Sequence, residues 1–423
     1  MKMDKFSQYS ARSFLQTGTH ALPARSVLLT GTYSCQNKGD AAMQVSTARQ
    51  LAEQFGDAVG VAMLAPFADA DAFFYAPMPV HPCDRRKLVR GTLALRHGAA
   101  ARKTAAADLV IDLSGDMLTE DYGPHVAWSH FLPLLRAWAT GTPYFICAQS
   151  IGPFKLTLPI ARFLLNRAAG ITVRDRISLD YLRAIGIDRA PLIQTADMAF
   201  LLEPADRAQS LARIAAAGLN PEAPITGVSV SRLIADRFDR QRGRSPGDFV
   251  KGMVNMLARF GEQQQCQFLF TPHVTGPSAI KDDRILSREV AALLPPSLRC
   301  GAIDGDLRPE EIKGVIACTD LFVGARMHAN IAALSSHVPT LAMAYSHKTP
   351  GIMAECGMAD YWLDIDTMDW PEFAAKLDAL NTNRTMLRDR LVGRIAHQQA
   401  EAQRNVALIA DVLWPASEKD QTR

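Results

Sequence analysis

The 423-residue sequence predicts an α/β protein with two Rossmann-like domains whose parallel sheets face a central cleft. Three observations lead to this prediction. Short apolar, β-branched runs alternate with amphipathic segments from Ser26 onward. The alternation breaks in the polar sequence Leu-Glu-Pro-Ala-Asp-Arg at 202–207 and then resumes, which indicates a linker. The length also exceeds one typical domain of roughly 100–200 residues.

The first domain is expected over residues 26–203. Apolar runs of strand length predict strands that are buried on both faces, as in a parallel sheet. Longer stretches with apolar residues at every third or fourth position predict helices. The expected strands are 26–30, 59–64, 109–112, 144–148, 171–173 and 192–195, and the expected helices are 40–55, 87–103, 125–139, 156–169 and 177–185.

The second domain is expected over residues 207–382 and repeats the pattern. Its predicted strands are 225–230, 267–271, 321–323 and 340–344, with helices at 248–264, 282–294, 309–317 and 329–335. Residues 383–423 begin with a charged amphipathic pattern, predicted as a long helix that packs across a domain surface. Residues 1–25 are polar, lack an apolar core of signal-peptide length, and are expected to be a mobile lead-in.

The amino-acid composition indicates which classes of partner and site are not expected. Lys plus Arg total 46 against 43 Asp plus Glu, a net charge of +3, so a nucleic-acid partner is not expected. The seven cysteines are scattered without a Cys-x-x-Cys pair, which favours free thiols in a reducing compartment over disulfides or a zinc site. No apolar stretch approaches the ~18 residues that span a bilayer. We therefore expect a cytoplasmic protein without a metal.

Two polar segments follow predicted strands of the first domain. The loop 31–40, which contains Asn37 and Asp40, exposes backbone N–H groups suited to an anion or a sugar hydroxyl, although it could equally serve only to turn the chain. It lacks the dinucleotide and P-loop glycine spacings. In 111–123, Asp116 is the favoured candidate for a base that accepts a hydroxyl proton. Aspartates are also common in turns for local reasons.

Basic residues follow three other predicted strands. Arg174 ends a first-domain strand, where its planar guanidinium could bind phosphate or carboxylate, or pair with neighbouring Asp175. In the second domain Arg326 and His328 open a helix, and Lys348 follows the next strand. A helix N-terminus already favours anions. Arg326, His328 and Lys348 are therefore expected to converge on one small anionic ligand.

Read in order, the segments resemble the polysaccharide pyruvyl transferase family over about 27–357. The resemblance rests on Asn37-x-Gly39-Asp40, Ala148-Gln-Ser-Ile-Gly-Pro-Phe154, Val173-Arg-Asp-x-x-Ser178, Thr195-Ala-Asp197-Met-Ala-Phe200, Pro272-His273, Gly324-x-Arg-x-His328 and Tyr345-x-x-Lys348. It implies a GT-B-like fold, with an N-terminal acceptor domain and a C-terminal donor domain.

The resemblance also implies phosphoenolpyruvate as donor and co-substrate, without another cofactor, and a saccharide acceptor that is often lipid-linked. Donor binding is then assigned to Arg174, Arg326, His328 and Lys348. The acceptor side is assigned to Asn37, Asp40, Ser114 and Asp116, although Leu113-Ser114-Gly115 stands where the family tends to have a run of glycines.

The expected reaction is ketal formation in cell-surface polysaccharide biosynthesis. His328 is the candidate acid that protonates the donor, and Asp116 and Asp40 are the candidate bases. Cationic neighbours would oppose the acid role of His328, so its role as a ligand is the firmer expectation. Two alternatives stay open: a glycosyltransferase or epimerase of the same shape that uses a nucleotide sugar, and a non-catalytic saccharide-binding or assembly protein.

The segment 85–103 mixes Arg and Lys with leucines. It could rest on an anionic membrane surface at the inner face of the cytoplasmic membrane, near a lipid-linked acceptor. The favoured interpretation is a helix with an ordinary solvated basic face.

Overall fold

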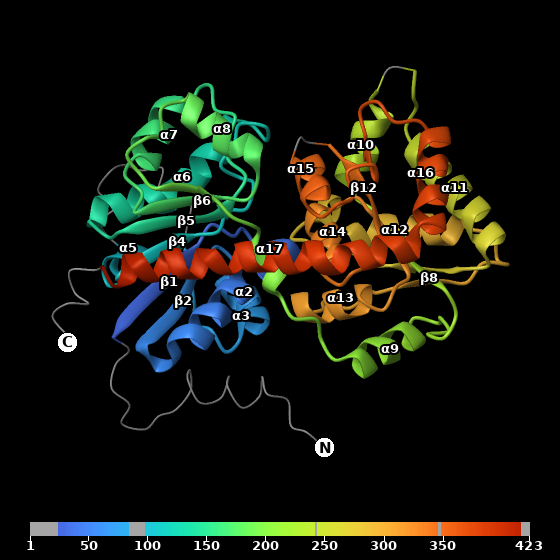
Figure 1. Ribbon diagram of the computed structural model, residues 1–423, viewed down its shortest axis with the longest axis horizontal. Coiled ribbons are helices and arrows are strands. Elements are labelled where there is room, and N and C mark those ends of the chain that lie inside the picture. The colour runs from blue at the N-terminus through green and yellow to red at the C-terminus, as the bar shows by residue number, and fades with distance from the viewer. Residues whose placement is uncertain (1–23, 84–97, 242, 346–347, 416–423) are drawn as a thin grey trace. The chain divides into compact units, whose positions relative to one another are not determined.

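The computed structural model describes residues 24–83, 98–241, 243–345 and 348–415 (Figure 1). The chain forms two compact units. Unit 1 comprises residues 1–35, 40–201 and 400–423, and unit 2 comprises residues 36–39 and 202–399. The main division at Leu201/Leu202 adjoins the linker expected from sequence. Residues 36–39 group with unit 2, although the sequence analysis placed them in the first domain.

Unit 1 contains one seven-stranded parallel sheet in the order β3-β2-β1-β4-β5-β6-β7. Its strands are β1 (Arg25–Thr30), β2 (Val59–Ala65), β3 (Val80–Pro82), β4 (Leu109–Asp112), β5 (Tyr144–Gln149), β6 (Gly170–Val173) and β7 (Leu192–Gln194). The strand order reverses direction between β1 and β4. Because right-handed crossovers put successive helices on opposite faces when the direction reverses, this unit is doubly wound.

The helices of unit 1 cover both faces of its sheet. They are α2 (Lys38–Phe55), α3 (Ala68–Tyr75), α5 (Ala99–Ala105), α6 (Pro124–Thr140), α7 (Leu158–Leu165) and α8 (Arg176–Ala184), with 3₁₀ turns at Gly56–Ala58 and Met198–Leu201. Of α2, the residues from Asp40 onward belong to unit 1. Helices α2 and α3 lie on one side of the strands, and α6 and α7 lie on the other (Figure 1). Phe131, Leu164 and Val173 belong to the buried core beneath α6 and α7.

Unit 2 repeats this topology with six parallel strands in the order β10-β9-β8-β11-β12-β13. Its strands are β8 (Ile225–Ser229), β9 (Gln267–Phe270), β10 (Cys300–Ala302), β11 (Leu321–Gly324), β12 (Thr340–Ala344) and β13 (Trp362–Asp364). Here the strand order reverses between β8 and β11. Ligands of open α/β sheets bind beyond the carboxyl ends of the strands at such a reversal.

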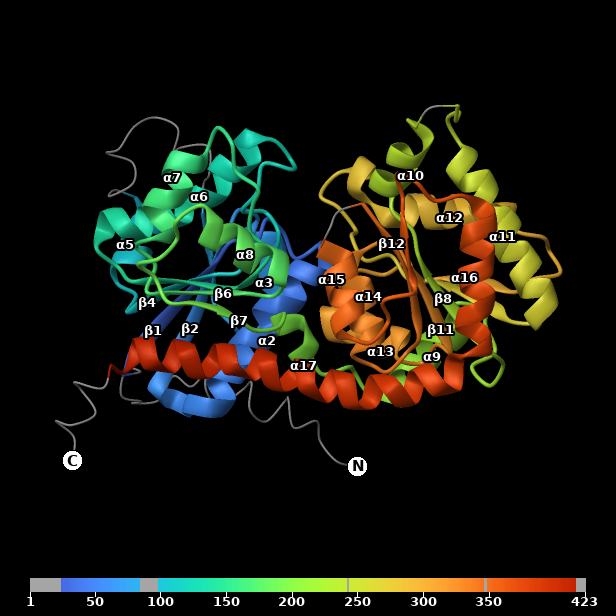
Figure 2. The same cartoon turned by 45° about the horizontal axis from the view of Figure 1, so that its top comes forward.

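The helices of unit 2 are α9 (Arg207–Ala216), α10 (Arg232–Asp239), α11 (Asp248–Gln264), α12 (Asp283–Leu293), α13 (Pro309–Ile316), α14 (Met327–Leu334), α15 (Lys348–Glu355) and α16 (Trp370–Thr382), with a 3₁₀ turn at Ala279–Lys281. Figure 2 shows α10 and α12 on one side of the strands and α9 and α13 on the other. Ile214, Val315 and Phe322 lie in the core between the sheet, α9 and α13.

Helix α17 (Arg384–Leu413) contributes its residues up to Gln399 to unit 2 and the remainder to unit 1. In unit 1, Asn405 is fully buried and accepts a hydrogen bond from Thr195 Oγ1 (2.9 Å) while its Nδ2 donates to the carbonyl of Ala196 (3.1 Å). Trp414 packs on Phe55 of α2. The end of this helix therefore packs on unit 1 beside the Thr195-Ala-Asp197 sequence.

The prediction of an α/β fold with parallel sheets is confirmed. The sequence analysis missed α3, α9, α10, α15 and α16 and the edge strands β3, β10 and β13. The predicted helix 87–103 and the basic segment 85–103 lie outside the described residues up to residue 97, and α5 covers Ala99–Ala105. The lead-in 1–25 is likewise outside them, apart from its last two residues.

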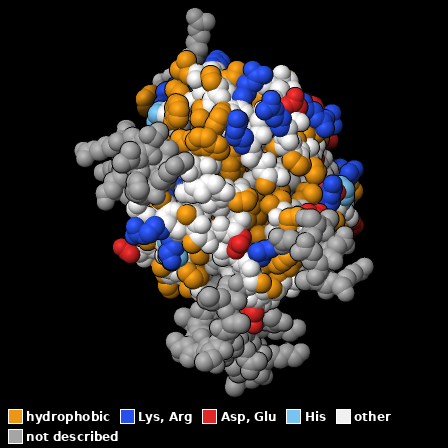
Figure 3. Space-filling model, turned by 90° about the vertical axis from the view of Figure 1, so that its left-hand side faces the viewer, with side chains coloured by type: hydrophobic (Ala, Val, Ile, Leu, Met, Phe, Trp, Pro, Cys, Tyr) orange, Lys and Arg blue, Asp and Glu red, His pale blue; other side chains and the backbone are white. Residues whose placement is uncertain are grey.

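The side of unit 1 that faces left in Figure 1 is shown in Figure 3, where hydrophobic and basic side chains intermix and acidic ones are few. Among the described residues, no helix combines the length and the hydropathy that a membrane crossing requires.

Candidate functional site

In unit 1 the carboxyl ends of β1 and β4 meet closely at Gly31, which has φ +103°. A Cβ at this position would lie 2.6 Å from Asp112 Oδ1 and 2.6 Å from the backbone nitrogen of Ser114. Glycine is therefore required both by the backbone conformation and by the close approach. This contact sets the loop after β1 beside the loop after β4.

Ser114, expected on the acceptor side, is buried in a hydrogen-bonded chain. Its hydroxyl donates to Asp112 Oδ1 (2.9 Å) and lies 3.1 Å from His130 Nδ1 on α6. Gln149 Nε2 donates to the other carboxylate oxygen of Asp112 (2.8 Å). Because Ser114 donates to Asp112, its oxygen is available to accept from the Nδ1–H tautomer of His130. This chain of hydrogen bonds thus connects β4, β5 and α6.

Asp116 accepts a hydrogen bond from the Tyr122 hydroxyl (2.8 Å) and is partly exposed. Its charge reaches Arg174. Burial opposes the charge of Arg174, but Asp197 and then Asp116 hold the pKa of the guanidinium above its ordinary value. The structure therefore brings Asp116 and Arg174, two residues selected from sequence, into one electrostatic environment within unit 1.

Arg174 follows β6 and is almost completely buried, with 1% of its surface exposed. Its Nη1 forms an ion pair with Asp197, and its Nε donates to Ser150 Oγ (2.9 Å). The sequence analysis named Asp175 as the alternative partner. Asp175 instead caps α8 by accepting from the Ser178 backbone (2.7 Å), and it also accepts from Ser150 Oγ (2.6 Å).

Three of the quoted sequence motifs therefore interlock around Arg174. Ser150 comes from Ala148–Phe154, Asp175 and Ser178 from Val173–Ser178, and Asp197 from Thr195–Phe200. A buried charge needs a partner and hydrogen bonds to offset its lost hydration. These residues hold Arg174 in place inside unit 1.

Asn37 and Asp40 lie in different units, although the sequence analysis grouped them. Asn37 Oδ1 accepts from the backbone N–H of Gly39 (3.2 Å), so Asn37 caps α2, and Asp40 lies in the first turn rather than at the cap. Asp40 faces Tyr75 of unit 1. Burial first, and then the charges of Cys35, Asp71 and Asp40, raise the pKa of the Tyr75 hydroxyl well above its ordinary value.

The segment Gln36–Gly39 is paired with the loop after β9. The Lys38 backbone donates to the His273 carbonyl (3.0 Å), and the Thr275 backbone donates to the Gln36 carbonyl (2.9 Å). The Lys38 side chain is buried, with its Nζ 3.6 Å from Asp306 Oδ1. Lys38 was not selected from sequence, although it stands between two residues of the Asn37-x-Gly39 motif.

Arg326 is the N-cap residue of α14 and forms a two-point ion pair with Asp283 of α12. The distances are 3.1 Å from Nε to Oδ2 and 2.7 Å from Nη2 to Oδ1. Asp283 also accepts from the Val274 backbone (2.9 Å). Burial raises the pKa of Asp283, and Arg326 and these hydrogen bonds oppose that shift. Asp283, absent from the sequence prediction, thus orients Arg326.

His273 lies at the centre of the basic residues in unit 2. Burial lowers the pKa of its imidazole well below the ordinary value, and the charges of His328, Arg326 and Lys38 lower it further. The structure therefore gathers Lys38, His273, Arg326 and His328 in one region beyond the carboxyl ends of β9 and β11. His273 was quoted only as part of the Pro272-His273 motif, and a histidine after a proline gives no local signal of a site.

Lys348 begins α15 and is buried, with 1% of its surface exposed, and Tyr345 directly follows β12. The two residues between them lie outside the described part of the chain. That Lys348 converges with Arg326 and His328 stays a prediction. That Arg174 converges with these three residues stays a prediction too.

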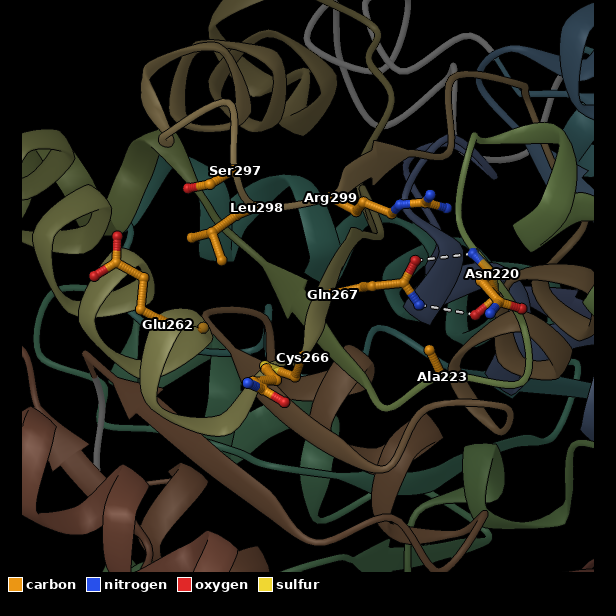
Figure 4. Close-up of a pocket in the computed structure, with 10 residues that line it drawn as sticks. Asn220, Ala223, Glu262, Cys266, Gln267, Ser297, Leu298 and Arg299 are labelled. Carbon is orange, nitrogen blue, oxygen red and sulfur yellow. Dashed lines mark hydrogen bonds between the residues drawn. The ribbon is translucent and has the colours of Figure 1, made fainter.

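A surface pocket in unit 2 lies elsewhere, at the amino end of β9 (Figure 4). Gln267 and Asn220 line this pocket and form two hydrogen bonds with each other. Gln267 Nε2 donates to the Asn220 carbonyl and Gln267 Oε1 accepts from the Asn220 backbone, both at 2.8 Å. Because this pocket lies at the opposite end of the sheet from the basic residues, it is not the candidate site.

Among the described residues, no group of three or more His, Cys, Asp or Glu side chains could hold a metal ion.

Two doubly wound units with polar loops at the carboxyl ends of their strands define a protein of the GT-B-like class. Two solved structures share this fold. The UDP-GlcNAc 2-epimerase of Neisseria meningitidis, bound to UDP-GlcNAc, has a TM-score of 0.60 and 10% identity, covering 92% of this chain and 99% of that one. HepE of Anabaena, in complex with UDP and glucose, has a TM-score of 0.55 and 14% identity, covering 94% and 100%.

Within this class the chain belongs to the polysaccharide pyruvyl transferase family, which residues 37–347 match. It is also similar to the amylovoran biosynthesis protein AmsJ of Erwinia amylovora, with 23% identity over 315 residues, 72% of each chain. The family resemblance drawn from the sequence motifs is thereby confirmed.

Proposed function

We propose that this protein transfers the pyruvyl group of phosphoenolpyruvate onto two hydroxyls of a saccharide, forming a cyclic ketal during cell-surface polysaccharide biosynthesis. Family membership supports a transferase, and the similarity to an amylovoran biosynthesis protein supports a role in polysaccharide biosynthesis. The observation that carries the choice of donor is the gathering of Lys38, Arg326 and His328 around His273 in unit 2. Phosphoenolpyruvate has a carboxylate and a phosphate, and several cations compensate the cost of desolvating both.

The chemistry assigns distinct tasks to these residues. An acid, for which His328 is the candidate, delivers a proton to the methylene carbon, and a sugar hydroxyl adds to the neighbouring carbon while a base takes its proton. The second hydroxyl then forms the second C–O bond as the bond to phosphate breaks, and inorganic phosphate leaves. Positive side chains stabilise the departing phosphate.

On the acceptor side, Asp116 and Asp40 are the candidate bases of unit 1. The partly exposed position of Asp116, with one oxygen held by Tyr122, suits a carboxylate that accepts a proton from an attacking hydroxyl. Ser114 is buried and bonded to Asp112 and His130, which favours a role in shaping the loop over direct proton transfer. Asn37, as the cap of α2, supports the segment that carries Lys38.

The acceptor is proposed to be a saccharide, in its natural form a lipid-linked one that this protein meets at a membrane surface. The test is phosphate release from phosphoenolpyruvate in the presence of a panel of free and lipid-linked saccharides, with mass analysis of the product. A saccharide that gains one pyruvyl ketal supports the proposal. If phosphoenolpyruvate is not consumed and a nucleotide sugar is, the glycosyltransferase or epimerase alternative replaces it. Turnover of neither donor, although saccharides bind, would indicate the non-catalytic alternative.

A further inference from the structure

A group of buried polar side chains lies at the carboxyl ends of β8 and β9 in unit 2. Ser229, Ser231, Thr271 and His273 are each at most 3% exposed. Their hydroxyl oxygens and both ring nitrogens of His273 have no hydrogen-bond partner among the described residues. Buried polar atoms of native proteins are nearly always paired, so several such atoms in one region call for a functional explanation.

The strand register places these residues together. Val228 of β8 pairs with Phe270 of β9, so Ser229 and Thr271 follow at neighbouring positions. Ser231 and His273 come two residues later along each chain. The Ala325 backbone donates to the Ser229 carbonyl (2.8 Å), which joins the end of β11 to the same edge. The group therefore lies where the strand order of unit 2 reverses, at the expected position of a ligand in an open α/β sheet.

The charges facing His273 come from two segments. His328 and Arg326 belong to the turn after β11 and the start of α14, and Lys38 belongs to the segment paired with the His273 backbone. Asp283 of α12 faces Arg326 and the Val274 backbone. A neutral imidazole in this position offers one N–H donor and stands among cations and hydroxyl donors. Such an environment suits an oxyanion.

We propose that His273, together with the hydroxyls of Ser231 and Thr271, binds the phosphate group of the donor. A planar carboxylate matches the fork of one guanidinium, whereas phosphate presents terminal oxygens in a tetrahedral arrangement that single donors from separate segments can surround. The identity of the donor rests on the proposed function. The phosphate site itself would serve any phosphorylated donor.

The experiment compares ligand-induced rises in the thermal unfolding midpoint for the full-length protein and its variants. The ligands are phosphoenolpyruvate, inorganic phosphate and pyruvate. The variants are His273→Leu, His273→Gln and Thr271→Val, and the matched control is Thr226→Val, which alters a buried threonine at the amino end of β8. Ligand that binds the folded state alone raises the midpoint by mass action.

We expect His273→Leu to unfold at an unchanged or higher temperature without ligand, because an apolar side chain replaces buried atoms that lack partners. Its affinity for phosphate and for phosphoenolpyruvate should fall by about tenfold or more. The response to pyruvate should persist, and Thr226→Val should respond like the wild type. Thr271→Val should also weaken phosphate binding, and His273→Gln should retain part of it.

The inference is overturned if the response of the wild type to phosphate persists unchanged in His273→Leu. If that variant does not fold, an unchanged response of Thr271→Val overturns it. Loss of the pyruvate response with the phosphate response retained overturns the assignment to phosphate. If the wild type responds to phosphate but not to phosphoenolpyruvate, the proposed function fails while the phosphate site stands. A wild type that responds to none of the three ligands contradicts both.

Discussion

The backbone of Gly39 lies directly against the imidazole of His328. A Cβ at position 39 would fall 2.3 Å from both Cγ and Nδ1 of that ring, closer than van der Waals contact permits. The position of the His328 side chain therefore requires a glycine nearly three hundred residues earlier in the sequence. Any larger residue at position 39 must displace the ring or the backbone.

The first prediction follows from this contact. Gly39→Ala should lower turnover by about tenfold to hundredfold, because displacements near 1 Å in a catalytic geometry have effects of that order. Phosphate release with a pyruvylated saccharide product measures it. Gly305→Ala is the matched control, since a Cβ there would meet only Leu307 at 3.7 Å. Equal activity of the two variants would remove His328 from the site.

The second prediction concerns the buried ion pair of unit 1. Asp197→Asn leaves the Arg174 guanidinium buried without its carboxylate, which should reduce the free energy of unfolding by about 3–5 kcal/mol. Urea denaturation measures this loss. The control Asp180→Asn breaks an exposed pair with Arg176 and should change stability little. A small effect of Asp197→Asn would mean that the remaining carboxylates, Asp116 and Asp175, compensate the charge of Arg174.

The third prediction assigns the base. Asp116→Asn should lower turnover by about a hundredfold or more while leaving the affinity for phosphoenolpyruvate within about threefold of the wild type, because a general base acts on the acceptor hydroxyl. Steady-state kinetics with both substrates separates the two effects. Asp121→Asn changes an exposed aspartate of the same loop and serves as control. Unchanged turnover would reduce Asp116 to a residue that positions Tyr122.

The fourth prediction is a pH dependence of stability. The pKa of folded His273 lies well below the unfolded value of about 6.5, so the unfolded chain binds the proton first. The contribution of neutral His273 to the free energy of unfolding is therefore present above about pH 6.5 and is lost as the pH falls. Between about pH 7.5 and about pH 5.5 the wild type should lose about 1.4 kcal/mol more stability than His273→Leu. Parallel stability profiles would contradict this prediction, because they would show that the pKa of His273 is the same in the folded and unfolded protein.

The sequence predicted the central strands well because each contains a short apolar run, as in Leu-Val-Ile at 109–111 and Leu-Phe-Val at 321–323. It missed β10, whose three residues Cys-Gly-Ala carry no strand pattern. Helix α10 was missed since it follows its strand almost directly, with only Val230 and Ser231 between them.

For the site, local patterns identified Arg174, Arg326 and His328 because each stands at a strand end or a helix start. They did not reveal that Asp197 and Asp283 hold the two arginines. Those pairs join residues separated by 23 and 43 positions. Lys38 and His273 were also overlooked, since their proximity arises from the pairing of segment 36–39 with the loop after β9. Only the folded chain shows such a contact.

The central claim is that phosphoenolpyruvate is the donor, and the most direct measurement compares the thermal unfolding midpoint with phosphoenolpyruvate and with UDP. At a ligand concentration of about 100 times its dissociation constant, phosphoenolpyruvate should stabilise the wild type by about 2.7 kcal/mol, and UDP should stabilise it less. Lys348→Ala should weaken phosphoenolpyruvate binding by roughly ten- to hundredfold, since a charge-assisted contact is lost. Stabilisation by UDP without stabilisation by phosphoenolpyruvate would contradict this account.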